Sequence, residues 1–202
     1  MRACAALTAI AMLGATIPAY AYAQAAYPAV AVLDAARTAC AGVATIEGAK
    51  AQLAKAGWAK VADPSTSPVG PILSYGITAG ERFIGDRGSV GFETPVYRKT
   101  VASEDLWLIL SDVNMDGVAV HGCRIYDPGE ERRIEPAIAT RWMGRAPSKV
   151  EERPELTRVL WEPGAAADQD SFELFHIPAA SPAREFVRIT GIAIKADWVG
   201  KP

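Results

Sequence analysis

Leu106-Trp107-Leu108-Ile109-Leu110 is the stretch that decides the fold. It is apolar at every position, which predicts a strand buried on both faces. Residues 118–126 have the composition of a partner strand. The four residues between Val113 and Val118, Asn-Met-Asp-Gly, suit a hairpin turn because glycine accepts a positive φ. An antiparallel hairpin at the centre of a sheet is therefore expected.

Further short strands are predicted on both sides of this hairpin. Apolar runs broken by glycine or proline favour strands at 72–77, 82–84, 95–101, 156–161, 171–177 and 185–198. In the last run the apolar positions change parity at Gly191, so a bulge or bend is expected there. Residues 147–154 are polar and charged and are interpreted as a loop.

Helical spacing dominates the region before these strands. Residues 30–60 are rich in Ala, Leu and Lys, and Gly42 and Gly48 divide them into two predicted helices, the second near 46–56. One further helix is predicted near 136–143, because a proline fits its first turn and Gly144 follows its last. Runs of strands beside separate helices predict an α+β fold, with N-terminal helices packed on a mainly antiparallel sheet.

The first residues have the layout of a secretory signal peptide. A short basic start precedes an uncharged apolar run of about 15 residues, and small residues in Ala-x-Ala spacing follow Pro18. We expect residues 1–23 to be cleaved and residues 24–202 to form a single domain. No later stretch has the length to cross a bilayer. The sequence therefore predicts a periplasmic or secreted protein.

Cysteine usage agrees with export. Cleavage would remove Cys4 and leave Cys40 and Cys123, and an even count in an oxidising compartment predicts one disulfide. Two free buried thiols are the alternative.

Composition excludes two broad classes. The chain has 202 residues, 50 % of them hydrophobic and 22 % charged, with a formal net charge of −2. Such hydrophobicity excludes a disordered chain. The charge balance lacks the basic excess with which nucleic-acid-binding proteins contact phosphates, so no nucleic-acid partner is expected.

Asp112-x-Asn114-x-Asp116-Gly117 is the sharpest local motif. Three oxygen-bearing side chains at alternate positions before a glycine resemble the start of a calcium loop. The twelfth position, which should supply a bidentate glutamate, is Cys123. Calcium binding by Asp112, Asn114 and Asp116 is one hypothesis, and a polar hairpin tip is the other.

His121 and Cys123 would share one face of a strand, since side chains alternate with a period of two. A thiol beside an imidazole can act as a nucleophile, and His176 could join them in a partial zinc site. A structural cysteine near a partly buried histidine explains the pair equally well. An exported hydrolase with a cleft assembled around His121 and His176 is therefore kept as an alternative function.

No nucleophile, metal or cofactor motif in the sequence is complete. The sequence thus favours a non-enzymatic binding or envelope accessory protein that needs no cofactor. Its expected partner is an envelope or extracellular protein or ligand, and no feature indicates an oligomeric state. The expected binding surface combines the 114–117 turn with the glycine-rich stretch 76–91, because loops carry function on such scaffolds.

Overall fold

The computed structural model describes residues 26–200. The predicted signal peptide, residues 1–23, lies outside these residues. The helices are α1 (Ala29–Ala39), α2 (Ile46–Lys55), α3 (Gly70–Ile84), α4 (Pro136–Met143) and α5 (Arg184–Val187), with 3-10 turns at Pro64–Thr66 and Gly85–Arg87. The strands are β1 (Ala59–Lys60), β2 (Gly88–Val101), β3 (Glu104–Met115), β4 (Val118–Pro128), β5 (Lys149–Arg153), β6 (Leu156–Trp161), β7 (Ser171–Ile177) and β8 (Gly191–Val199).

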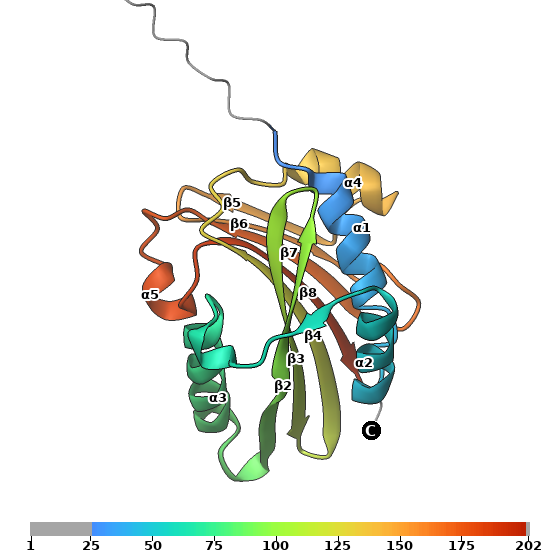
Figure 1. The fold of residues 1–202 in the computed structure, drawn as a ribbon, viewed down its shortest axis with the longest axis vertical. Helices are drawn as coiled ribbons and strands as arrows, with labels where there is room; N and C mark the ends of the chain where they lie inside the picture. The colour runs from blue at the N-terminus through green and yellow to red at the C-terminus, as the bar shows by residue number, and fades with distance from the viewer. Residues whose placement is uncertain (1–25, 201–202) are drawn as a thin grey trace, which may run out of the picture.

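The strands form one eight-stranded antiparallel sheet in the order β1-β2-β3-β4-β8-β7-β6-β5. Consecutive strands β2, β3 and β4 are neighbours, and so are β5, β6 and β7. The last strand in the chain, β8, lies between these two groups and pairs with β4 on one side and β7 on the other (Figure 1). The predicted α+β fold is confirmed.

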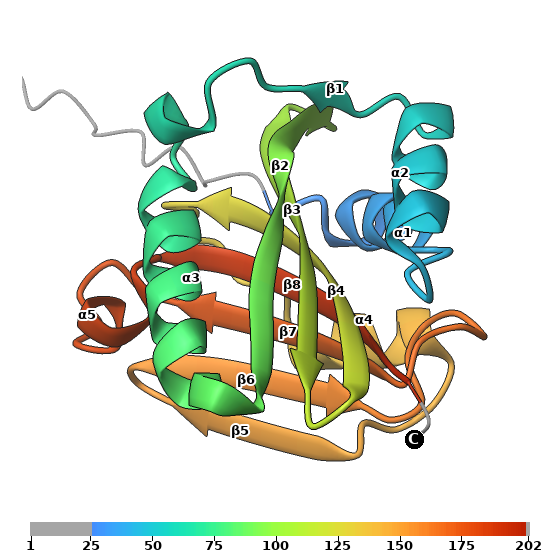
Figure 2. The ribbon, with the colours of Figure 1, turned by 90° about the horizontal axis from the view of Figure 1, so that it is seen from below.

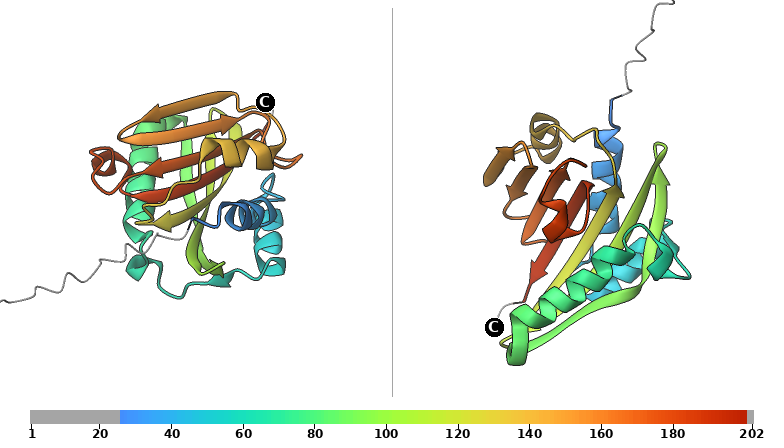
Figure 3. Two further views of the ribbon diagram at one scale, coloured as in Figure 1. Left: turned by 90° about the horizontal axis from the view of Figure 1, so that it is seen from above. Right: turned by 90° about the vertical axis from the view of Figure 1, so that its left-hand side faces the viewer.

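Helices α1, α2 and α4 cover one face of the sheet, here called the first face. Leu106, Leu108 and Leu110 of β3 and Ile194 of β8 pack there against α1 and α2. The larger part of the buried apolar side chains lies in this layer. Helices α3 and α5 lie on the opposite, second face, as the side view in Figure 3 shows for α3.

A disulfide joins the first helical layer to the sheet. Cys40, at the end of α1, is bonded to Cys123 of β4, and both residues are fully buried. The bridge closes a loop between residues 83 positions apart. The disulfide predicted from the cysteine count is confirmed.

The central hairpin is confirmed with a shorter turn than expected. Met115 pairs with Val118, so only Asp116 and Gly117 connect β3 to β4. Both have positive φ, 53° and 81°, as a type I′ turn requires. The predictions for α2, α4, β6 and β7 also hold within about one residue.

The strands predicted at 72–77 and 82–84 are wrong, because this segment is helix α3. The glycines in this segment obscured its helical pattern. Leu73, Ile77 and Ile84 recur at helical spacing, and Pro71 fits the first turn. The close approach of α3 to the sheet requires one of these glycines. A Cβ on Gly80 would lie 2.8 Å from a methyl carbon of Val90 on β2.

Two other predictions are wrong in part. The predicted loop at 147–154 contains strand β5, whose charged side chains are typical of an exposed edge strand. The predicted strand at 185–198 begins only at Gly191, after helix α5 and the left-handed residue Arg188. The change of parity at Gly191 thus marks the start of a strand and not a bulge within one.

Removing the disulfide should destabilise the protein. The chain-entropy model gives about 4–5 kcal/mol for a loop of this length. We expect Cys40→Ala/Cys123→Ala to lose about this much free energy of unfolding in a urea titration. Wild-type protein measured in reducing agent should lose a similar amount. An unchanged midpoint in both samples would contradict a stabilising bridge.

Candidate functional site

The second face of the sheet carries an apolar pocket between α3, α5 and the strands β4, β8 and β7. Its volume is about 250 Å³, just below the usual range of small-molecule sites. Figure 2 shows α3 and α5 at the end of the sheet where β7 ends and β8 begins. The walls are apolar or aromatic side chains: Ile72, Tyr126, Phe175, Ile177, Val187 and Ile189.

The strand register explains why a hollow forms here. Ala193 of β8 pairs with Tyr126 of β4 and with Phe175 of β7. Paired residues on neighbouring strands project to the same face, so a single methyl group lies between two large aromatic side chains. Helix α3 packs against β2, where Gly80 contacts Val90, and only Ile72 of its first turn reaches the pocket.

An ionic network borders the pocket. The buried carboxylate of Glu173 accepts a hydrogen bond from Lys195 Nζ at 2.9 Å and forms an ion pair with Arg158. Lys195 also lines the pocket, with Nζ 5.6 Å from the centroid of the Phe175 ring. Because Glu173 binds the ammonium group, Lys195 contributes mainly its aliphatic stem to the pocket wall and does not present a free charge there.

Tyr126 adds a polar group to the apolar wall. The residue is 7 % exposed, and burial raises the pKa of its phenol, so the hydroxyl is neutral near pH 7. Among the residues whose side chains the structure describes, none forms a hydrogen bond with this hydroxyl. The hydroxyl is not one of the fully buried polar atoms without a partner, so it reaches solvent.

A second, wider hollow shares one lining residue, Ile189, with the pocket. Its volume is about 440 Å³, and it lies between the first turn of α3 and helix α5. Arg184 donates to the carbonyl of Ala179 at 3.1 Å, and the Arg188 guanidinium lies 5.5 Å from the Tyr75 ring centroid. Within the described chain, no carboxylate is within ion-pair distance of either arginine. Glu185 also lines this hollow, so two cations face one anion.

The residues of the calcium motif lie on the central hairpin and not in a curled loop. Asp112 and Asn114 are in β3, paired with His121 and Ala119, and Asp112 lies 3.5 Å from His121 Nε2. Asp116 is in the turn, 3.8 Å from Arg87. The extended backbone of β3 separates the side chains of Asp112 and Asn114 from that of Asp116. Calcium binding at this motif stays a prediction.

The two histidines lie at opposite ends of the sheet. His121 pairs with Trp198, and His176 pairs with Ile192, six residues away on β8. At about 3.4 Å per residue, the two positions are about 20 Å apart. His121 stacks on Trp198 and binds the carbonyl of Ala44. The structure therefore does not bring the two into one cleft, and the disulfide occupies the thiol of Cys123.

The expected loop surface is only partly a set of loops. Helix α3 and strand β2 contain most of residues 76–91. The structure does bring the end of this stretch to the 114–117 turn, because Gly88 pairs with Met115 and the Asp116 amide donates to the Arg87 carbonyl.

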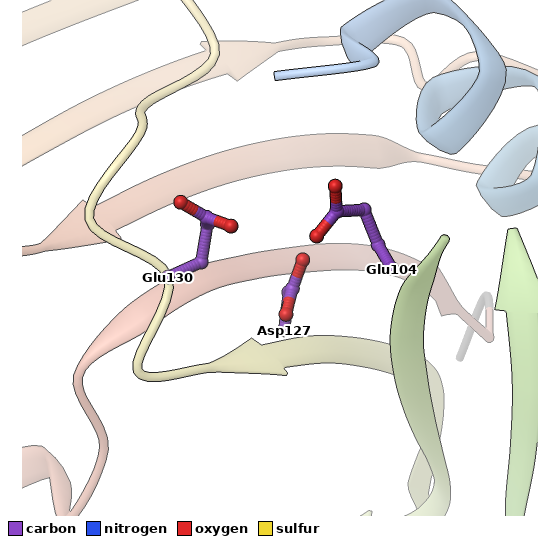
Figure 4. A group of neighbouring side chains, drawn as sticks. All are labelled: Glu104, Asp127 and Glu130. Carbon is purple, nitrogen blue, oxygen red and sulfur yellow. The ribbon is translucent and has the colours of Figure 1, made fainter. Parts of the chain in front are cut away.

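A carboxylate cluster on the first face was not predicted. Glu104, Asp127 and Glu130 point toward one another in Figure 4, with one carboxylate oxygen of each within 4.8 Å of the others. Arg132 forms ion pairs with Glu104 and Glu130. The Tyr27 hydroxyl donates to Asp127 at 2.8 Å. These partners anchor the segment before α1 to the end of β4, which indicates a structural role.

The environment of Asp127 changes its ionisation. Burial raises its pKa to about 6, and the carboxylates of Glu104 and Glu130 add to this effect. The hydrogen bond from Tyr27 and the charge of Arg132 act in the opposite direction. By contrast, hydrogen bonds from Arg132 lower the pKa of Glu130.

Comparison with family models, curated proteins and solved structures finds no match to this chain. Among the described residues, no helix has both the length and the apolar character that a membrane span requires. The geometry of the pocket is therefore the main indication of function.

Sequence reasoning missed the pocket because its walls come from distant segments. Ile72, Tyr126 and Phe175 are each separated by about 50 residues along the chain. One available signal was Ala193, a small residue between Ile192 and Ile194 in β8.

Asp127→Asn should remove one component of the pH dependence of stability. Because the folded-state pKa is raised, the Asp127 contribution is complete below about pH 4 and is lost as the pH rises through 6. Wild-type protein should therefore lose up to about 3 kcal/mol more than the variant between pH 4 and 7. Urea unfolding followed by tryptophan fluorescence measures this. Asp86→Asn, at an exposed position, should keep the wild-type slope. An Asp127→Asn slope equal to that of Asp86→Asn would contradict the assignment.

Proposed function

We propose that this protein is an exported, non-enzymatic binding protein that holds a small apolar molecule between α3 and α5. The observation that carries the proposal is the pocket over Ala193, which combines apolar walls with few polar groups. This composition is typical of sites that bind by burial and orient the ligand with one or two hydrogen bonds.

Two features support export to the periplasm or the medium. The Cys40–Cys123 disulfide is of the kind that persists in oxidising compartments. The first residues of the sequence have the pattern of a secretory signal peptide. In that setting, the protein would carry or sequester its ligand outside the cytoplasm.

The packing of the second face supports binding at this place. Phe186 and Val187 of α5 are 69 % and 40 % exposed, and Tyr75 of α3 is 39 % exposed. Of these exposed side chains, Val187 is part of the pocket wall. A ligand in the pocket would cover apolar surface that now faces water. Burial of this surface contributes about 25 cal/mol per Å² to the free energy of binding.

Binding of 1-octanol tests the proposal with a neutral probe of suitable size. A ligand of nine heavy atoms and ordinary ligand efficiency should bind with a Kd on the order of 0.1–1 mM. In a ¹⁵N-labelled sample, saturable shifts should centre on the amides of Tyr126, Phe175 and Ala193.

Filling the pocket should abolish this binding. Ala193→Leu places a larger side chain between Tyr126 and Phe175 and should keep the fold, because it fills an existing hollow. Ala62→Leu makes the same change at an exposed position and is the matched control. The proposal fails if wild-type protein shows no saturable shifts, or if folded Ala193→Leu binds 1-octanol as tightly as Ala62→Leu does.

A further inference from the structure

We infer that the ligand is a free medium-chain carboxylate, with its alkyl chain over Ala193 and its carboxylate near Arg188. The inference rests on the proposed binding function and adds the chemical class of the ligand. Two observations carry it: the volume of the apolar pocket, and the two arginines of the adjoining hollow that form no ion pair with a described carboxylate.

The volume of the apolar pocket suits a short alkyl chain. At roughly 30 Å³ for one water molecule in the liquid, 250 Å³ corresponds to about eight heavy atoms. A free chain of about eight carbons therefore has a suitable size for this pocket.

The charge beside the pocket selects the head group. Arg184 and Arg188 line the adjoining hollow and form no ion pair with a carboxylate of the described chain, whereas the cations bordering the pocket itself are paired with Glu173. An arginine binds a carboxylate through two parallel hydrogen bonds. Glu185 is the one acidic side chain that lines this hollow. The net positive charge there favours an anion.

The two hollows have the relative position that an amphipathic molecule requires. Ile189 lines both, so a chain that fills the apolar pocket can pass this residue and reach the arginines. An alcohol of the same length gains the same burial in the apolar pocket, but only an anion also gains from the arginines.

Three ligands that share one chain test the head group. Octanoate, 1-octanol and octylammonium are titrated into the full-length protein at pH 7.5, and amide shifts give each Kd. We expect octanoate to bind at least tenfold more tightly than 1-octanol, and octylammonium to bind most weakly. A charge-assisted hydrogen bond supports a difference of this size.

A side-chain variant tests the contact with the carboxylate. Arg188→Gln should weaken octanoate about tenfold and leave 1-octanol unchanged. Arg82→Gln is the matched control, since Arg82 is exposed on α3 and lies about 16 Å along the helix from Pro71. It should change neither affinity.

The outcomes separate the two proposals. Equal affinities for octanoate and 1-octanol, or tighter binding of octylammonium, overturn the carboxylate and leave the apolar pocket supported. The assignment of the carboxylate to Arg188 is also overturned if Arg82→Gln loses as much octanoate affinity as Arg188→Gln does. If none of the three ligands binds, the proposed function itself fails.

Discussion

Pairing of β8 with both β4 and β7 is the interaction on which the rest of the structure depends. Without β8, the chain holds two separate antiparallel groups of strands, each with unpaired edges. Because β8 comes last in the sequence, the sheet is complete only when the end of the chain inserts between them. Ile192, Ile194 and Ala196 then bury their side chains in the first-face core. The fold therefore depends on contacts between distant segments, which form slowly.

The same strand gives the two faces different properties. On the first face, β8 presents large side chains to α1 and α2, and the disulfide at Cys123 joins the neighbouring strand to this layer. On the second face, β8 presents Ala193 between two aromatic residues. Because α3 packs over β2, its body leaves this part of the sheet uncovered. The pocket thus follows from one small residue in the central strand together with the placement of one helix.

The sequence was sufficient where local signals and burial agree. The hairpin of β3 and β4, the helices α1, α2 and α4, and the disulfide were predictable because apolar spacing, turn residues and an even cysteine count indicate them directly. Helix α3 was not, because its glycines, which permit close packing on β2, resemble breaks between strands. Strand β5 was missed because an exposed edge strand carries the charges of a loop. The pocket and the cluster around Asp127 depend on the pairing of distant strands, which no local pattern encodes.

A crystal structure of the protein with 8-bromooctanoate would show whether the pocket holds a medium-chain carboxylate and in which orientation. Anomalous scattering from bromine locates the end of the alkyl chain without assumptions about the ligand's conformation. The account predicts one bromine peak beside Ala193, between Tyr126 and Phe175, and carboxylate density near Arg188. A bromine peak at another surface, or an alkyl chain that runs in the opposite direction, would contradict it.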